Sequence, residues 1–548
     1  MNQAEPVVQA FLDDVLADDP VLATALGLTE GAGRLPSWSA EALAGRACMV
    51  RGHEQRLLPL VQSTDVDTAV DAFAGLQIAH RLLRPITLCR CQHVSPGTYL
   101  DVLYGLLPLL MRELGTSAAR VDALDGRLRA TPALLDEARD NLEHGLPAVA
   151  VQVAVDQAQG MLELAGPTVR AFAAQVGRPG ALDESSAAAC EALAGFLDYL
   201  RDDLLPGASP QCGAGREVLA DILRWEHVLG ETPEELAAYG REVLAETIAR
   251  MAELTAALGY PDVATAVAAV CDQHPAADGL VAAYERAVLE ARDYVVTHDI
   301  VSLPPGEELR VTATPGFLRS ALPFAAYDAP GPYLERQLGF YWVTPPREGL
   351  TGGELDSALR NHPTASLANT GVHEAYPGHH VQLTAANRAS TLARRIAGIP
   401  EGGNILVEGW AFYCEELMEQ QGFLAGPHTR LMRLNDQAWR ACRVVIDVEL
   451  HLGVMDLAAA VDFLASVTHM NRDDAELECR RYAVEPGQAM SYLLGKREVQ
   501  RLAALHHERH AASLCEFHDE LLSWGSLPPA VIAWGMGLAP APAAALSS

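Results

Sequence analysis

The chain has 548 residues, of which 49% are hydrophobic and 20% are charged, so it is long enough to bury a large core. Acidic residues outnumber basic residues by 71 to 40, which gives a formal net charge of −31. This charge disfavours nucleic acid and anionic membrane surfaces as partners, and a neutral or cationic small substrate stays possible. No stretch has 18 uninterrupted apolar residues, so we expect no membrane span.

The pattern of the ten cysteines and the N-terminal residues indicate where in the cell we expect the protein. Cys89 and Cys91 are the closest cysteine pair, and the chain has no C-x-x-C motif. This pattern predicts reduced thiols in a cytoplasmic protein. The first residues lack a basic segment followed by an apolar run, so we expect no signal peptide. For the assembly we expect a monomer or a homodimer.

Most of the chain has the composition and apolar spacing of helices. Apolar residues recur at helical spacing over 7–30 and 39–90, and further helices are predicted at 99–115, 131–143, 147–176, 183–204, 216–228 and 232–258. A Gly/Pro-rich break at 206–215 predicts a lobe boundary. We therefore expect an N-terminal helical lobe at 1–210 and a metal-binding catalytic lobe at 211–548, with the two lobes packed as one body.

The pattern changes between about 300 and 345. Short β-branched or aromatic runs occur at Ile300-Val301, at 309–312 and at 340–343, each bounded by proline or glycine. These runs predict a small β-sheet.

One stretch concentrates residues that bind metals. His373, Glu374, His379 and His380 lie within eight residues, among apolar neighbours. Buried imidazoles and carboxylates need partners, and a divalent metal ion satisfies several of them at once. In the common His-Glu-x-x-His motif the second histidine is at i+4, but here that position is Pro377.

A regular helix cannot hold one ion with this spacing. His379 would lie about 240° around the axis from His373, and His380 would lie about 10 Å along it. Pro377 and Gly378 favour a break, and a local bulge of two residues would bring His379 into the usual i+4 place. This argument favours His379 as the second ligand and leaves His380 as the alternative.

A third ligand is expected, because catalytic zinc usually has three protein ligands and one open position. Glu408 is a carboxylate in an otherwise apolar helix, and the neighbouring Gly409 is small enough for close approach. The alternative for Glu408 is a helix-start carboxylate near the positive end of the helix dipole. The sequence thus predicts one zinc ion bound by His373, His379 and Glu408.

Three motifs together carry a family resemblance. HEAYPGHHVQ at 373–382, VEGWAFYCEE at 407–416 and RYAVEPGQAMSYLLG at 481–495 resemble the bacterial domain-of-unknown-function family 885. More distantly, the chain is similar to the thimet oligopeptidase, angiotensin-converting enzyme and carboxypeptidase Taq group of helical zinc peptidases. The Gly-His pair, the later Glu ligand and the late Tyr-Ser-Tyr-Leu segment of that group match Gly378-His379, Glu408 and 490–493, although this chain has two extra residues between Glu374 and His379.

The resemblance implies a mainly α fold: a large, two-lobed, helical zinc-peptidase-like fold with a deep central cleft. It also implies that the small sheet lies near the metal and holds an extended substrate by backbone pairing. Tyr327 is a candidate for the cleft lining and for substrate binding, although aromatic residues more often belong to the core.

The expected chemistry is hydrolysis of an amide or peptide bond by zinc-activated water. Glu374, next to a ligand, would act as general base. Tyr492, which matches the Tyr-Ser-Tyr-Leu segment, is the first candidate to stabilise the oxyanion, and Tyr482 is the second. Arg481 and Gln488 are candidates to bind a substrate carboxylate or backbone.

A charged stripe follows the predicted metal site. Arg440, Arg443, Asp447 and His451 recur along one helix, and a solvated, salt-bridged face is the simplest interpretation. The alternative is that Asp447 or His451 orients a metal ligand.

We therefore predict a metallohydrolase, either a zinc metallopeptidase or an amidohydrolase, that acts on a small peptide or amide substrate. Two alternatives stay open from the sequence. One is a metal-dependent hydrolase or lyase of a non-peptide small molecule, and the other is a metal-dependent binding protein without turnover.

Overall fold

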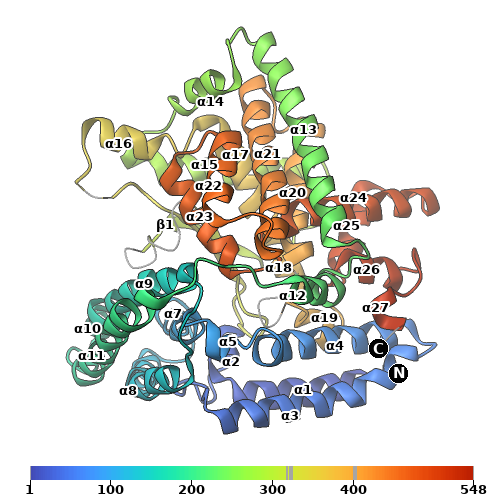
Figure 1. The fold of residues 1–548 in the computed structure, drawn as a ribbon. Helices are drawn as coiled ribbons and strands as arrows, with labels where there is room; N and C mark the ends of the chain where they lie inside the picture. The colour runs from blue at the N-terminus through green and yellow to red at the C-terminus, as the bar shows by residue number, and fades with distance from the viewer. Residues whose placement is uncertain (1, 316–318, 320–324, 348, 399–403, 547–548) are drawn as a thin grey trace. The chain divides into compact units, whose positions relative to one another are not determined.

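The computed structural model describes residues 2–315, 319, 325–347, 349–398 and 404–546. Part of the segment predicted to form the sheet, at 316–318 and 320–324, lies outside the described residues. The described chain is mainly helical and contains a small three-stranded sheet (Figure 1). The predictions of a mainly α fold and of a small sheet are thus confirmed.

The chain divides into two compact units. Unit 1 contains residues 1–214 and 331–335, and unit 2 contains residues 215–330 and 336–548. The boundary between Ala214 and Gly215 falls inside the Gly/Pro-rich stretch of the sequence.

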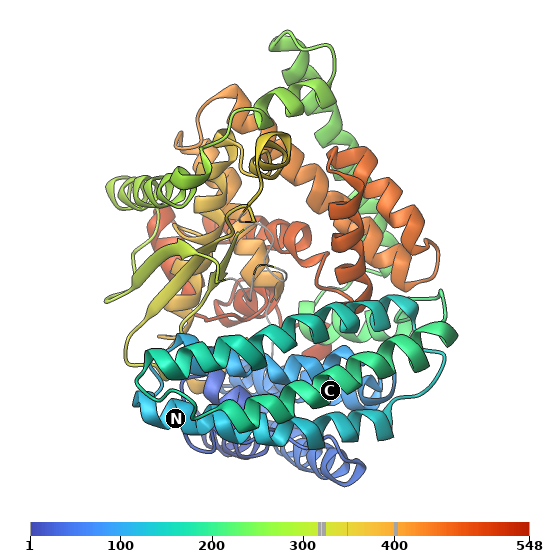
Figure 2. The same ribbon diagram turned by 90° about the vertical axis from the view of Figure 1, so that its left-hand side faces the viewer.

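Helices are the main elements of unit 1 in its described residues, and α11 packs against both α8 and α9 (Figure 2). Its α-helices are α1 (Glu5–Asp18), α2 (Pro20–Ala25), α3 (Ala40–Leu57), α4 (Val66–Thr87), α5 (Cys91–Val94), α6 (Gly97–Leu103), α7 (Leu106–Met111), α8 (Ser117–Asn141), α9 (Ala148–Glu163), α10 (Val169–Gln175) and α11 (Asp183–Asp198).

Several helix boundaries in unit 1 differ from the prediction, among them that of the helix expected at 99–115, which is split into α6 and α7. The expected helix at 7–30 is split, because the Asp19 carboxylate accepts hydrogen bonds from the N–H groups of Val21 and Leu22 and so begins a new helix. The helix expected to begin at Thr131 is instead the second half of α8, which continues through Pro132. Pairing with α11 keeps this helix continuous despite the proline.

Unit 2 contains the sheet and the remaining helices. The strands are β1 (Glu308–Ala313), β2 (Ala325–Asp328) and β3 (Leu338–Val343). The helices are α12 (Arg216–Asp221), α13 (Pro233–Ala257), α14 (Val263–Cys271), α15 (Leu280–Thr297), α16 (Gly352–Leu359), α17 (Thr364–Glu374), α18 (His379–Ala386), α19 (Leu392–Arg395), α20 (Asn404–Gln420), α21 (Pro427–His451), α22 (Leu457–Thr468), α23 (Arg472–Val484), α24 (Ser491–Arg509), α25 (Leu514–Leu522), α26 (Pro529–Gly535) and α27 (Ala543–Leu546).

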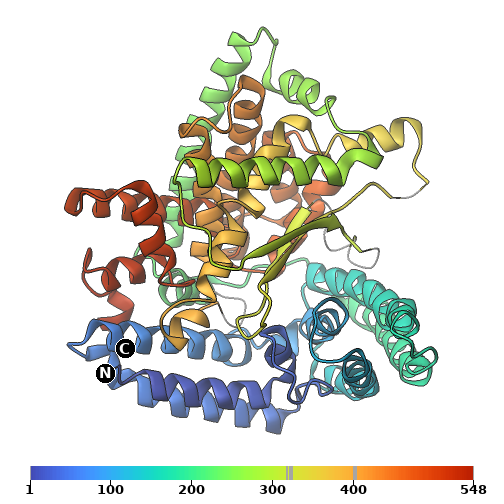
Figure 3. The same ribbon diagram turned by 180° about the vertical axis from the view of Figure 1, so that it is seen from behind.

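The sheet has the order β1-β3-β2, with β3 parallel to β1 and antiparallel to β2. Tyr327 of β2 pairs with Tyr341 of β3, and α15 packs against β1 (Figure 3). The expected strand at Ile300-Val301 does not form. The Ile300 carbonyl instead accepts a hydrogen bond of 2.7 Å from His518 Nδ1, which takes the place of a strand partner.

Long helices form the core of unit 2 in two main pairs, α13 with α21 and α20 with α24. No helix among the described residues combines the length and the apolarity that crossing a bilayer requires.

Candidate metal centre

The His-Glu motif lies on two helices that meet at a sharp turn. α17 ends at Glu374 and α18 begins at His379, and the Tyr376–Pro377 peptide between them is cis. The Gly378 N–H donates a 3.0 Å hydrogen bond to the carbonyl of Val372. A Cβ at Gly378 would lie 1.9 Å from the carbonyl oxygen of His373, so only glycine fits. The helix therefore ends completely, where the sequence predicted a bulge of two residues.

Three side chains converge at this turn. His373 of α17, His379 of α18 and Glu408 of α20 each place one ligand atom within 4.8 Å of the others. We call these three residues the ligand cluster. Glu408 Oε2 lies 3.6 Å from His373 Nε2 and 3.4 Å from His379 Nε2. The structure thus brings together the three residues that the sequence singled out as ligands.

The ligand cluster fits a shared metal ion. Two ligand atoms at about 2.0–2.1 Å from a tetrahedral ion lie roughly 3.4 Å apart, whereas an N–H···O hydrogen bond measures about 2.9 Å. Glu408 Oε2 and His379 Nδ1 are buried, and neither has a hydrogen-bond partner in the described part of the chain. A buried carboxylate oxygen without a partner is unfavourable, and a cation between it and the two imidazoles would satisfy it. The donor set of two imidazoles and one carboxylate suits zinc and leaves an open position.

A second carboxylate on α20 orients the first histidine. His373 Nδ1 donates a 2.8 Å hydrogen bond to Glu415 Oε1, and Asn369 Nδ2 donates to Glu415 Oε2 at 2.9 Å. This arrangement fixes the tautomer of His373 and directs the lone pair of Nε2 toward the ligand cluster. The sequence analysis missed Glu415, although it lies in the VEGWAFYCEE motif and two helical turns after Glu408 on the same face.

The electrostatic field of the site favours cations. Burial alone would lower the pKa of His373, but the neighbouring carboxylates of Glu408 and Glu415 raise it to about 10. The field that holds a proton on this imidazole also stabilises a divalent cation at the same place.

Glu374 lies beside the ligand cluster. Burial raises the pKa of its carboxyl group, while the positive charges of His379 and His373 and the backbone N–H of Tyr327 lower it. These interactions place Glu374 next to the two histidines and to β2. A carboxylate with a raised pKa is suited to accept a proton near neutral pH.

His380 belongs to a separate hydrogen-bond network. Of the two neighbouring histidines, it is therefore His379 that lies in the ligand cluster. His380 is fully buried, and its Nδ1 lies 2.9 Å from the hydroxyl of Tyr327. Its Nε2 lies 2.7 Å from Glu307 Oε2, which also accepts a 2.7 Å hydrogen bond from Tyr376. The hydroxyl of Tyr327, a candidate substrate-binding residue, is therefore already bonded.

Tyr492 lies next to the ligand cluster. Its ring is nearly parallel to the His373 imidazole, at 13°, with 6.2 Å between ring centres. Its position depends on the crossing of α20 and α24, where a Cβ on Gly409 would lie 2.4 Å from Gly495 Cα. Burial, together with the charge of Glu408, raises the pKa of Tyr492 to about 12. Its hydroxyl therefore keeps its proton at neutral pH and can donate a hydrogen bond.

Tyr482, the second candidate for the oxyanion role, is held in a buried network. Its hydroxyl donates to Glu478 at 2.6 Å and accepts hydrogen bonds from Trp439 Nε1 at 3.0 Å and Arg443 Nε at 2.7 Å. All positions of this hydroxyl are in use, so the geometry favours Tyr492.

Arg481 and Gln488 lie beside this network and contact each other. Arg481 Nη1 donates to Gln488 Oε1 at 3.1 Å, and Arg481 Nη2 donates to Glu478 Oε2 at 3.0 Å. Their predicted role, binding a substrate, stays a prediction, because these contacts use two of the five N–H donors of Arg481.

The charged stripe on α21 is not a solvated face. Arg443, Asp447 and His451 are buried. The Asp447 carboxylate accepts hydrogen bonds from the N–H groups of Gly487 at 2.9 Å and Met490 at 3.0 Å, so it holds the connection between α23 and α24. His451 Nε2 donates to the carbonyl of Tyr482 at 3.0 Å. The simplest interpretation from the sequence, a solvated face, was therefore wrong, and Glu415 is the residue that orients His373.

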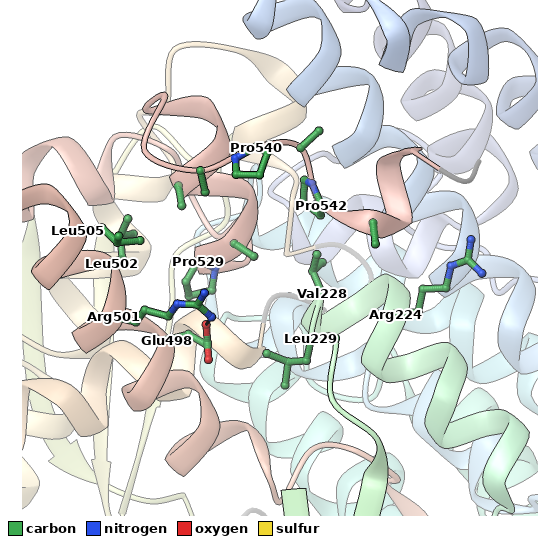
Figure 4. Close-up of a pocket in the computed structure, with 16 residues that line it drawn as sticks. Arg224, Val228, Leu229, Glu498, Arg501, Leu502, Leu505, Pro529, Pro540 and Pro542 are labelled. Atoms are coloured by element: carbon green, nitrogen blue, oxygen red, sulfur yellow. Dashed lines mark ion pairs between the residues drawn. The ribbon is translucent and has the colours of Figure 1, made fainter. Parts of the chain in front are cut away.

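A separate hollow of about 470 Å³ lies in unit 2 among the segment 224–230, α24, α26 and the segment 539–543 (Figure 4). Its walls are mostly apolar, with Glu498 and Arg501 paired at 3.8 Å on one side. No residue of the ligand cluster lines it. Helix α24 thus contributes Tyr492 to the metal centre and its later residues to this hollow.

Comparison with solved structures shows the fold. A candidate lipoprotein of unknown function from Shewanella oneidensis matches with a TM-score of 0.78 and 22% identity, over 96% of this chain and 98% of that chain. A candidate lipoprotein from Colwellia psychrerythraea matches with a TM-score of 0.83 and 18% identity, over 98% of both chains. Neither match tests the expected cytoplasmic location, which stays a prediction.

Comparison with protein families covers nearly the whole chain. No curated protein matches it. The model of the family described as "Bacterial protein of unknown function (DUF885)" matches residues 20–536, a range that includes the ligand cluster, Glu374 and Tyr492. The chain therefore belongs to the bacterial family DUF885.

Proposed function

We propose that this protein is a zinc-dependent hydrolase that cleaves a peptide or amide bond in a small substrate. The observation that carries the proposal is the convergence of His373, His379 and Glu408, with Glu374 beside them. The distant similarity of Gly378-His379, Glu408 and the segment 490–493 to helical zinc peptidases agrees with this proposal, although it involves two of the same residues.

Each residue would have a defined task. The ligand cluster would hold the ion, and Glu415 would keep His373 in the correct tautomer. The bound ion supplies Lewis acidity toward a carbonyl group and toward water. Glu374 would take a proton from the attacking water and deliver it to the leaving amine. The Tyr492 hydroxyl would donate a hydrogen bond to the oxyanion of the tetrahedral intermediate.

The open coordination position distinguishes a catalytic site from a structural one. Structural zinc sites usually have four protein ligands, whereas the ligand cluster provides three. Its carboxylate, Glu408, retains an exposed fraction of 15%, so the site is not sealed.

The test combines metal analysis with a variant of the general base. Purified protein should contain about one zinc ion per chain, and a chelator should remove both the metal and the activity toward a panel of dipeptides, longer peptides and N-acyl amino acids. Glu374→Gln should keep the metal and lose activity by about 10²–10⁴-fold, because it removes proton transfer alone. Glu253→Gln, an exposed substitution on α13, is the matched control.

Other outcomes would identify the alternative functions. Turnover of a non-peptide substrate that depends on both zinc and Glu374 would indicate a metal-dependent hydrolase or lyase of another class. Ligand binding without turnover would indicate a metal-dependent binding protein. Protein that binds no divalent metal would refute the proposal.

A further inference from the structure

Two arginines lie close to the metal centre on one face of α21. The guanidinium carbon of Arg443 lies 4.6 Å from the ring centre of Tyr492, and that of Arg440 lies 5.7 Å from it. Because Tyr492 stacks beside His373, only one aromatic ring separates the two cations from the ligand cluster.

Both guanidinium groups have buried N–H donors without a hydrogen-bond partner among the described residues. Arg443 uses Nε on Tyr482 and Nη2 on Glu478, but its Nη1 is buried and has no hydrogen-bond partner among the described residues. Arg440 Nε and Nη1 are also buried without such a partner, and the nearest carboxylate, Asp436, lies 3.5 Å from Nη1. The side chains of Arg443 and Arg440 are only 5% and 12% exposed. An unsatisfied donor on a buried cation is unfavourable, and an anion would relieve it.

The two carboxylates near these arginines, Glu478 and Asp436, already accept hydrogen bonds from other side chains. Glu478 accepts hydrogen bonds from Arg443, Arg481 and Tyr482. Asp436 accepts one from Asn369 at 3.3 Å. Arg443 therefore shares Glu478 with Arg481, and the ion pair between Arg440 and Asp436, at 3.5 Å, is longer than an ordinary hydrogen bond, so both guanidinium groups keep buried donors without a hydrogen-bond partner among the described residues.

We propose that Arg440 and Arg443 bind a carboxylate of the substrate, so that the substrate is an amide whose amine-side residue carries a free carboxylate close to the scissile bond. Peptides cleaved at their C-terminal residue and N-acyl amino acids both have this chemistry. The inference rests on the proposed function. Guanidinium groups bind carboxylates through paired N–H donors, which a neutral amide in the same place does not match.

This inference differs from the prediction from the sequence in the residues that bind the carboxylate. The net charge of −31 left a neutral or cationic substrate possible, but the charge of the whole chain does not describe the face of α21 that borders Tyr492. The sequence indicated Arg481 and Gln488 as candidates to bind a substrate carboxylate, and these two side chains contact each other, while Arg481 also contacts Glu478.

The test compares ligands that differ only in their carboxylate. Calorimetry would measure the binding of N-acetylphenylalanine and of N-acetylphenylalanine amide to the zinc-loaded full-length protein that carries Glu374→Gln, so that the acid is not turned over during the titration. In parallel, kcat/KM would be measured for N-benzoylglycylphenylalanine and for its carboxamide. We expect the acid to bind at least about tenfold more tightly than the amide, and to be hydrolysed with a correspondingly higher kcat/KM.

Arg440→Gln is the decisive variant, because Arg443 also holds Tyr482 and Glu478 and its removal would disturb the fold. Arg440→Gln should abolish the preference for the acid over the carboxamide, mainly by raising KM for the acid, and the zinc content should be retained. Arg430→Gln, on the same helix but 52% exposed, should keep the preference.

The two proposals fail in different ways. Equal affinities for acid and amide, or no binding of either, would overturn the carboxylate subsite even if the protein hydrolyses amides. A preference for the acid in binding, lost in Arg440→Gln, without hydrolysis of any substrate, would support the subsite and overturn the hydrolase.

Discussion

Glu415 Oε1 lies 2.8 Å from His373 Nδ1, and Glu415 follows the ligand Glu408 by two turns of α20. One helix therefore supplies both a member of the ligand cluster and the group that orients another member.

Glu415→Gln tests this relationship. The substitution keeps the shape of the side chain but removes the charge that supports the His373 imidazole, so we expect metal affinity to fall by about 10–100-fold. Competition with a chromophoric chelator measures the affinity. Glu253→Gln should leave it unchanged, and equal affinity of Glu415→Gln and the native protein would contradict the orienting role.

The crossing of α20 and α24 leaves no room for a methyl group. A Cβ at Gly495 would lie 1.9 Å from the carbonyl oxygen of Ile405, so Gly495→Ala should force the two helices apart and lower the free energy of unfolding by about 1–3 kcal/mol. Denaturant unfolding measures this change. At Gly353 nothing lies within 4 Å of an added Cβ, so Gly353→Ala should show no such loss.

Tyr327→Phe separates a structural role from a substrate-binding role. The variant leaves Nδ1 of the buried His380 without its 2.9 Å partner, which should cost about 1–3 kcal/mol of stability. We expect a lower denaturant midpoint and an unchanged KM. A raised KM with unchanged stability would instead show that the hydroxyl binds substrate, as the sequence suggested.

His518 should make stability depend on pH. Its Nδ1 donates to the Ile300 carbonyl and its Nε2 faces the Tyr413 hydroxyl at 3.1 Å, an arrangement that suits the neutral imidazole. Burial lowers the pKa of His518 to about 4. The unfolded chain, with a histidine pKa of about 6.5, therefore takes up a proton between pH 6.5 and 4 that the folded protein does not bind.

This contribution to stability is fully present above pH 6.5 and is lost as the pH falls toward 4. We expect His518 to account for about 2 kcal/mol of the loss between pH 7 and pH 5. Unfolding free energies measured at both pH values should show a smaller difference in His518→Gln. His298→Gln, at an exposed histidine, should keep the native pH dependence.

The ligand residues could be selected from the sequence because their chemistry leaves few alternatives. Proline at the i+4 position excludes a regular helix, and a carboxylate in the apolar segment that contains Glu408 needs a partner. His379 and His380 could be ranked but not separated, since the choice depends on the turn at Gly378 and on the partner that Glu307 gives to His380.

Other features depend on contacts between distant segments. Arg443 and Asp447 have the spacing of a salt-bridged surface stripe, and only the packing of α23 and α24 against α21 buries them. Strand β2 has only four residues, two of them alanine, and its pairing with β3 makes it a strand. Local periodicity contains no information about such pairings.

The Trp410 indole N–H donates a 2.8 Å hydrogen bond to the carbonyl of Pro377, which ties the turn between the two histidines to the helix that carries Glu408. This connection does not pass through an ion. The ligand cluster is consequently preorganised, so binding of the proposed metal ion would require little ordering of the chain, and metals of similar size should exchange without unfolding their surroundings.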